Sequence, residues 1–144
     1  MTLPFEYQNA SMQFDQFMID ARDFAQLATT NMAWNMVVGV LHTFRRRLTV
    51  EDALRFADVL PPVIRALFLE KWDVMQPVLT FGDNDDLLAE VRSVRFEHNF
   101  SPDNAIVAVA LALRKQVDAA KFEHLLTELP IGSIAFWSIT PKSG

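Results

Sequence analysis

The sequence feature that most constrains the fold is a repeat with a fixed offset of 69 positions. Aligning residues 35–68 with residues 104–137 without gaps gives seven identical positions, where roughly two are expected by chance. A fixed offset is typical of repeat proteins, so the alignment predicts two similar structural units. The identical pairs are Asn35/Asn104, Val38/Val107, Val40/Val109, Arg45/Arg114, Leu60/Leu129, Pro61/Pro130 and Ala66/Ala135.

Apolar residues recur at steps of three and four along most of the chain, which is the pattern of amphipathic helices. The segment 31–47 is apolar over most of its circumference, so we expect this helix to lie at the centre of a bundle. No segment alternates with the period of two that indicates a strand. We therefore predict an all-α helical bundle of two pseudo-symmetric four-helix repeats, with about eight helices. The candidate helix starts include Thr30, Thr49, Asp83, Asp118 and the run Ser101-Pro102-Asp103.

The two units are expected to share a single compact domain over residues 1–144, a length at which roughly 68% of the unfolded chain's surface can be buried. Residues 9–72 form the predicted first helical repeat, and residues 84–137 form the second. Residues 73–83 contain Pro77 and Gly82 and show no helical period, so they are predicted to be the linker.

Composition and charge argue against several classes of protein. The chain has no cysteine, which excludes disulfides and thiolate metal sites and suits a reducing compartment. The N-terminus lacks the basic and apolar regions of a secretory signal, and the longest apolar stretch is far shorter than a membrane span. These features predict a cytoplasmic protein with no membrane span. The net charge of −5 is spread evenly, which argues against nucleic acid as the main partner.

The most conspicuous polar feature is the triplet Arg45, Arg46 and Arg47. Each arginine offers a planar fork of donors, so the triplet is a candidate anion-binding or nucleic-acid-binding site. The triplet also stands at the end of a predicted helix, where positive charge favours the helix dipole. Consecutive helical residues point about 100° apart, so the three side chains cannot all serve one flat surface. The structural interpretation is favoured, and anion binding is kept as the alternative function.

No residue pattern predicts a catalytic, cofactor or metal site. His42, His98 and His124 share no ligand spacing on one helix, and none is matched by a second histidine in the repeat. The acidic run that begins at Asp83 lacks the glycine and glutamate that an EF-hand loop needs. The four glycines are too far apart to form a phosphate-binding loop. We therefore expect a protein that is not an enzyme and uses no cofactor. An enzyme or small-ligand carrier with its site in a seam between the two units is a third class that the sequence leaves open.

Aromatic residues at helix ends and in the linker supply the remaining functional clue. Such residues outside the helical stripes either close the seam between the repeats or form an exposed patch that marks a partner surface. The candidate partner-surface residues are Trp72, Phe81, Phe96 and Phe100. On this basis we expect a non-enzymatic protein-interaction or regulatory module, whose partner is another protein or a second copy of itself. Nucleic-acid or anion binding through Arg45–Arg47 is the alternative.

The order of these motifs resembles a known family. The run Arg45-Arg46-Arg47-Leu48-Thr49, the pair Leu60-Pro61 and the pair Trp72-Asp73 look like the first half of the bacterial domain of unknown function 2267. The second Leu-Pro pair and Trp137 are similar to its second half, so the resemblance runs from about Tyr7 to Trp137. It implies a small helical bacterial protein and carries no activity. Ala119 and Ala120 stand where the first half has Val50 and Glu51, which departs from equivalence of the two halves.

Overall fold

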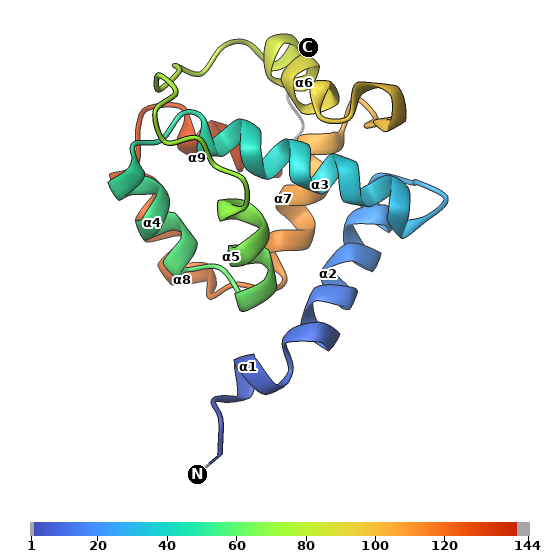
Figure 1. The fold of residues 1–144 in the computed structure, drawn as a ribbon, viewed down its shortest axis with the longest axis vertical. Helices are drawn as coiled ribbons and strands as arrows, with labels where there is room; N and C mark the ends of the chain where they lie inside the picture. Colours follow the sequence, from blue (N-terminus) through green and yellow to red (C-terminus); the bar gives the residue numbers. More distant parts are fainter. Residues whose placement is uncertain (1, 141–144) are drawn as a thin grey trace.

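The computed structural model describes residues 2–140 and confirms the all-α prediction (Figure 1). Within this range there are nine α-helices, one 3-10 helix and no strand. The eight predicted helices correspond in order to α2–α9, and the short helix α1 was not predicted. No helix in residues 2–140 is long and apolar enough to cross a membrane. The bounds are α1 Phe5–Gln8, α2 Ala10–Phe24, α3 Thr30–Arg45, α4 Val50–Asp58, α5 Pro62–Leu69, α6 Asn84–Ser93, η1 Phe96–His98, α7 Ala105–Arg114, α8 Ala119–Glu128 and α9 Ser133–Phe136.

Three of the predicted helix starts are confirmed by side-chain caps. Thr49, Asp83 and Asp118 each accept a hydrogen bond from the backbone N–H three residues later, at the starts of α4, α6 and α8. Each cap satisfies one of the backbone donors that the first helical turn leaves without a partner, which stabilises the helix by about 0.5–2 kcal/mol. Local side-chain chemistry therefore sets where these helices begin.

Two predicted helix starts are wrong by a few residues. Thr29 is the cap of α3, so Thr30 is the first helical residue. Helix α7 begins at Ala105 and not at Ser101. The hydroxyl of Ser101, the group that would cap a helix, instead donates to the side-chain oxygen of Asn99, so Ser101 belongs to the connection before the helix and does not cap it. Asn99, 2 residues before Ser101, thus takes the hydroxyl that the prediction assigned to the helix cap.

Helix α3 lies at the centre of the fold, as its apolar circumference predicts (Figure 1). It packs against α2, α5, α6 and α7. Eleven of its 16 residues are buried, including the polar residues His42 and Arg45. Because so much of α3 is enclosed, the residues at its C-terminal end meet several elements at once.

The hydrophobic core is continuous and joins both halves of the chain. Its middle is an aromatic cluster in which the Phe44 ring lies 4.8 Å from Phe56 and 5.1 Å from Phe136, measured between ring centroids. Trp137 follows α9, and its ring contacts the rings of Phe44, Phe56 and Phe136. Helices α4 and α8 lie side by side, with the Phe56 and Phe122 rings 5.9 Å apart (Figure 1).

The close crossing of α3 and α6 depends on Gly39. A Cβ atom at this position would lie 2.5 Å from the carbonyl oxygen of Val91, which is backbone and cannot rotate away. We therefore expect Gly39→Ala to force the two helices apart and to lower the free energy of unfolding by about 1–3 kcal/mol, the range for overpacked sites. Gly82→Ala is the matched control, because its Cβ would make only ordinary contacts with Asp86. Urea unfolding of both variants checks this, and equal stability of the two would contradict the close contact.

Candidate functional site

The C-terminal end of α3 directs the three consecutive arginines toward different neighbours. Arg45 is the last helical residue and faces the end of α5, while Arg46 and Arg47 face α6. The linker also returns to this point, because the backbone N–H of Leu79 donates to the carbonyl of Arg46 at 2.9 Å. The triplet is therefore the meeting point of α3, α5, α6 and the linker.

Arg45 and His42 together hold the C-terminal end of α5. Arg45 is buried, and its Nη1 donates to the carbonyl oxygens of Phe68 at 2.7 Å and Glu70 at 3.0 Å. His42 Nε2 donates to the carbonyl of Leu67 at 2.9 Å. These bonds satisfy carbonyl groups that a helix end leaves without partners. Burial, together with the neighbouring charge of Arg46, lowers the pKa of Arg45 to about 10, and burial also lowers the pKa of His42.

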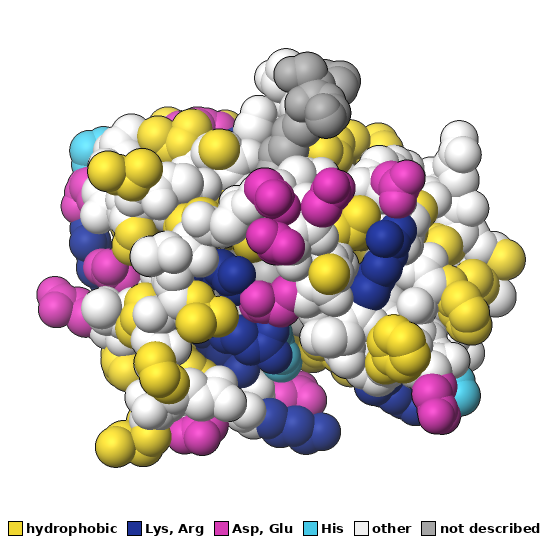
Figure 2. Space-filling view, turned by 90° about the horizontal axis from the view of Figure 1, so that it is seen from above, with side chains coloured by type: hydrophobic (Ala, Val, Ile, Leu, Met, Phe, Trp, Pro, Cys, Tyr) yellow, Lys and Arg dark blue, Asp and Glu magenta, His cyan; other side chains and the backbone are white. Residues whose placement is uncertain are grey.

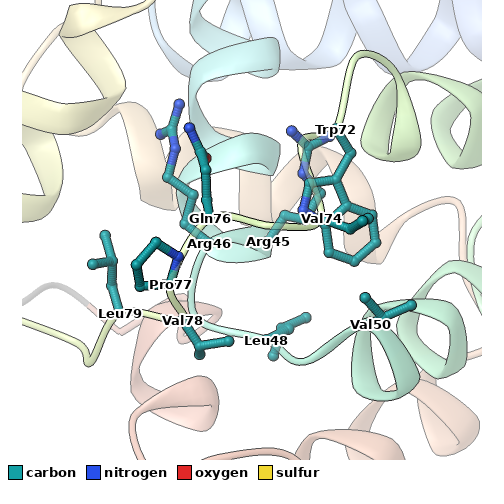
Figure 3. Close-up of a pocket in the computed structure, with 10 residues that line it drawn as sticks. All are labelled: Arg45, Arg46, Leu48, Val50, Trp72, Val74, Gln76, Pro77, Val78 and Leu79. Atoms are coloured by element: carbon teal, nitrogen blue, oxygen red, sulfur yellow. The ribbon is translucent and has the colours of Figure 1, made fainter.

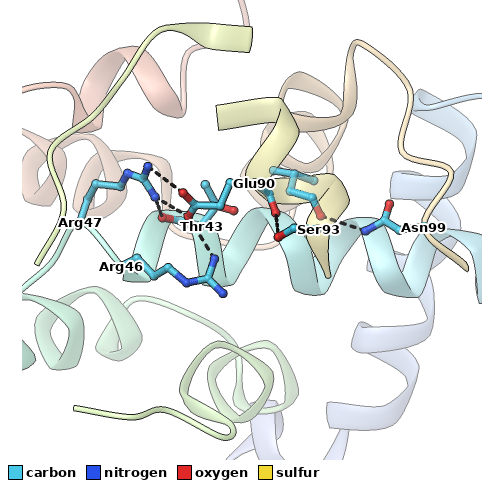
Figure 4. Close-up of polar contacts among 7 residues, drawn as sticks. Thr43, Arg46, Arg47, Glu90, Ser93 and Asn99 are labelled. Atoms are coloured by element: carbon cyan, nitrogen blue, oxygen red, sulfur yellow. Dashed lines mark hydrogen bonds and ion pairs between the residues drawn. The ribbon is translucent and has the colours of Figure 1, made fainter. Parts of the chain in front are cut away.

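Arg46 and Arg47 share the carboxylate of Glu90 on α6 (Figure 4). Arg47 makes a bidentate pair with this carboxylate, with Nη2 2.9 Å from Oε1, and it also donates to the carbonyl of Thr43 at 2.8 Å. Arg46 Nη1 lies 3.0 Å from Glu90 Oε2. Burial alone would raise the pKa of Glu90, but the hydrogen bonds from Arg47 and Arg46 outweigh it and lower that pKa.

Of the three guanidinium groups, those of Arg46 and Arg47 contact a carboxylate, and both contact the same one, that of Glu90. Arg45 makes no ion pair in the described part of the chain, and its Nε–H is buried without a partner. Glu70 acts on Arg45 only at longer range and itself lies 3.9 Å from Lys71 Nζ. Arg45 and Arg47 are committed to internal bonds, whereas the Arg46 side chain keeps 31% of its surface exposed. The local positive charge is incompletely neutralised, and Arg46 is the arginine that presents it to the solvent.

A pocket of about 300 Å³ opens beside this charge (Figure 3). Its lining includes Arg45 and Arg46 from the end of α3, Trp72 beyond α5, and linker residues that include Gln76 and Val78. The Arg45 guanidinium carbon lies 5.3 Å from the centroid of the Trp72 ring, a cation–π distance. The linker predicted at 73–83 contains no helix and forms one wall of this pocket.

The four candidate partner-surface residues do not share one environment. Trp72 and Phe81 are half-buried and pack against the core, with the Phe81 ring 6.0 Å from both Phe44 and Phe136. Phe96 is 80% exposed and Phe100 is 64% exposed, on the connection between α6 and α7. Trp72 and Phe81 therefore pack where the linker meets the core. Phe96 and Phe100 form the exposed apolar surface.

An asparagine-centred network on the connection from α6 to α7 was not anticipated from the sequence. The buried side chain of Asn99 donates to the carbonyl oxygens of Val91 and Val94, both at 2.9 Å. Asn35 on α3 donates to the carbonyl of His98 at 3.0 Å. These bonds fix the end of α6 and the 3-10 helix η1 against α3. The alignment of the two halves matches Asn35 to Asn104, and this match was the sequence signal for Asn35.

The three histidines lie in different settings. His42 is buried against α5, His98 ends η1, and His124 is exposed on α8, where its Nε2 lies 2.7 Å from Glu128 Oε1. Across residues 2–140, no group of three histidine, aspartate or glutamate side chains is placed to hold a metal ion.

The chain matches the family described as uncharacterized conserved protein, DUF2267, over residues 14–135. The chain belongs to this family. The resemblance drawn from the arginine triplet, the Leu-Pro pairs and the tryptophans is thereby confirmed. A comparison with curated proteins finds no match.

The DUF2267 match begins within α2 and ends within α9, so it contains the arginine triplet, Glu90 and the pocket beside Trp72. Residues 2–13 lie before the matched region. That segment contains α1, which has no buried residue. The family match thus covers the polar site and the helical body from residue 14 onward. It does not cover the N-terminal arm, which we define as residues 2–12.

Proposed function

We propose that the protein is a non-enzymatic protein-interaction or regulatory module, with a second copy of the chain as one candidate partner. The observation that supports this is the high exposure of phenylalanines that lie outside the apolar faces of the amphipathic helices. Phe5 is 76% exposed, Phe96 80% and Phe100 64%. Aromatic residues are enriched in protein interfaces, because they bury a large apolar area at a low cost in conformational entropy.

The N-terminal arm supplies one apolar surface. It projects from the helical body (Figure 1) and carries exposed side chains at Leu3, Phe5, Tyr7 and Met12. A 3.3 Å hydrogen bond from Arg65 Nη1 to the Tyr7 hydroxyl links this arm to α5. Apolar side chains on a projecting arm gain stability when a partner covers them, since burial is worth roughly 25 cal/mol per Å².

The second apolar surface is the pair Phe96 and Phe100. Figure 2 shows another face of the molecule, on which apolar side chains gather in several patches separated by charged ones. Exposed Arg95, Glu97 and His98 stand beside this pair in the sequence, and an apolar centre with a polar rim is typical of protein interfaces. The arm and the phenylalanine pair come from separate segments of the chain, so substitutions can separate their contributions.

Sedimentation velocity across a range of protein concentrations tests self-association. We expect the wild type to associate, and Phe5→Ser or the double variant Phe96→Ser/Phe100→Ser to weaken this association. Ile131→Ser is the matched control, because Ile131 is fully exposed on the turn between α8 and α9, outside both surfaces. A wild type that stays monomeric and binds no other protein would overturn the proposal. If Ile131→Ser weakens association as much as the other variants do, the association is non-specific hydrophobic contact.

Anion binding at the end of α3 is the second candidate function. The observation that favours it is the unequal charge there, where three guanidinium groups lie close together and one carboxylate, that of Glu90, contacts only Arg46 and Arg47. Arg46 is the group available to a ligand, since the guanidinium groups of Arg45 and Arg47 are bound within the fold. A small anion suits a single accessible arginine better than a nucleic acid, whose binding requires several phosphate contacts.

We also propose that the two halves are copies of one structural unit. Arg45 Nη1 donates to the carbonyl of Phe68, and Arg114 donates to the carbonyl of Trp137, so the repeated arginine binds a carbonyl 23 residues later in both halves. Helices α3 and α7 end 69 positions apart, and α4 and α8 begin 69 positions apart. These contacts and boundaries support the repeat inferred from the alignment.

Equivalent leucines give the test of this repeat. Leu60 and Leu129 are both buried at the corner that follows α4 and α8 respectively. We expect Leu60→Ala and Leu129→Ala each to lower the free energy of unfolding by about 2–5 kcal/mol, the range for large-to-small changes in a core. Urea unfolding measures both. If Leu129→Ala proves harmless while Leu60→Ala unfolds the chain, the two corners are not equivalent.

A further inference from the structure

The pocket beside Arg46 has an apolar part and a polar part (Figure 3). Leu48, Val50 and Val78 lie together on one side of it, and Trp72 forms a further apolar wall. The side chains of Arg46 and Gln76 lie next to each other on the polar side. The pocket therefore offers apolar contact and hydrogen-bond donors within one space of about 300 Å³.

Charge beneath the pocket favours an anion. Arg45 forms part of the lining and is 95% buried, given its 5% exposure, and its Nε–H has no partner. Arg46 and Arg47 divide one carboxylate between them, that of Glu90. An anion in the pocket would meet uncompensated positive charge in partly desolvated surroundings, where electrostatic attraction is stronger than in water.

We propose that this pocket binds a small carboxylic acid with an apolar body. Its carboxylate would lie against Arg46 and Gln76, and its apolar part would lie against Trp72 and the valine and leucine walls. This assignment rests on the anion-binding candidate and adds the class of ligand.

The shape of the site favours a carboxylate over a phosphate. The planar fork of one accessible arginine matches the two oxygens of a carboxylate, and such charge-assisted pairs are the strong hydrogen bonds of proteins. A phosphate dianion keeps a large hydration shell, which the apolar walls cannot replace. The pocket volume stands at the lower end of the range for ligand sites, so the ligand is small.

Hexanoate is a suitable probe, with 1-hexanol as its neutral counterpart and inorganic phosphate as an anion that has no apolar body. A ligand of this size is expected to bind with a Kd on the order of 1 mM. In a heteronuclear NMR titration, we expect hexanoate to shift the backbone amide resonances of residues 46–50, 72–76 and 78–79. The pair between the hexanoate carboxylate and the Arg46 guanidinium is lost when 1-hexanol replaces hexanoate or when Arg46 is changed to glutamine. In either case we expect binding to weaken at least about tenfold.

Two further variants make the outcome specific. Arg92→Gln is the matched control, because Arg92 pairs with Asp103 on the connection to α7 and is absent from the pocket lining. It should leave hexanoate binding unchanged. Val78→Asp places a negative charge in an exposed part of the wall and keeps Arg46, so it should weaken hexanoate binding at least about tenfold. It also provides a second readout if Arg46→Gln disturbs the fold.

Each unfavourable result has a distinct meaning. If 1-hexanol binds as tightly as hexanoate, the carboxylate is not recognised and the assignment is overturned. If phosphate binds through Arg46 as tightly as hexanoate, anion binding stands but the apolar carboxylate is overturned. If neither anion shifts these resonances, both the assignment and the anion-binding candidate fail. Shifts confined to the separate pocket near Phe14 and Trp34 would likewise overturn the assignment.

Discussion

Replacing Trp137 with alanine should lower the free energy of unfolding by about 3–5 kcal/mol, the range for removing a buried tryptophan or phenylalanine. Trp137 has no exposed surface, although it lies only 7 positions before the end of the sequence. Its ring lies 5.3 Å from Phe44, 5.7 Å from Phe56 and 6.1 Å from Phe122, measured between centroids. The truncation would leave a cavity where α3, α4 and α8 meet, and such an enclosed site can collapse little.

Trp34→Ala is the matched control for this experiment. Trp34 is the same residue type, but 39% of its surface is exposed, and its ring makes an edge contact with the Phe14 ring. We expect it to cost about 1 kcal/mol. Urea unfolding at one temperature compares the two variants. Equal losses would mean that the aromatic cluster is not the centre of the core.

Glu90→Gln should lower the free energy of unfolding by about 2–4 kcal/mol. Breaking a fully buried ion pair costs about 3–5 kcal/mol, and the Glu90 side chain keeps 21% exposure, which reduces this value. The substitution preserves shape but leaves Arg47, whose side chain is 6% exposed, without a counter-charge and next to Arg46. The bidentate pair between α3 and α6 would be replaced by weaker neutral hydrogen bonds.

Glu97→Gln is the matched control, because Glu97 is exposed on η1, and it should change stability by no more than about 0.5 kcal/mol. Arg46→Ala should cost under about 1 kcal/mol, since its pair with Glu90 is partly exposed. A Glu90→Gln variant as stable as the Glu97→Gln control would show that Arg47 needs no counter-charge.

The effect of Glu90→Gln should also depend on pH. The folded state lowers the pKa of Glu90 below its ordinary value of 4.5, so the folded state holds the carboxylate form more strongly than the unfolded state does. The stabilisation from this group is therefore fully present above that ordinary value and is lost as the pH falls through the lowered pKa. Urea unfolding of the wild type and Glu90→Gln at neutral and acidic pH should show the difference between them shrinking on acidification. A difference that stays constant with pH would contradict the ion pair.

The elements of this fold were predictable because their signals are local. The apolar circumference of residues 31–47 predicted that α3 would be central, and Thr49, Asp83 and Asp118 predicted three helix starts correctly. In each case the residues that form the structure lie within one or two helical turns of each other. Where a partner outside the helix competed, as with Ser101 and Asn99, the predicted start was displaced.

The candidate site was predictable only in part. The sequence marked the arginine triplet and showed that its side chains must diverge, because successive helical residues point in different directions. It could not show that Arg45 binds α5 while Arg47 binds Glu90, 43 residues further along the chain. It also could not separate the half-buried Trp72 and Phe81 from the exposed Phe96 and Phe100.

The sequence by itself predicted helices α2–α9 and the family and indicated a repeat, since these depend on hydrophobic periodicity, capping chemistry and residue order. Only the tertiary structure decided which charges are neutralised inside the fold. Burial of Arg45 and Arg47, the pairing of Arg46 with Glu90 and the pocket beside Trp72 arise where α3, α5, α6 and the linker converge. A side chain's electrostatic role depends on the neighbours that desolvate and pair it, and those neighbours are distant in sequence.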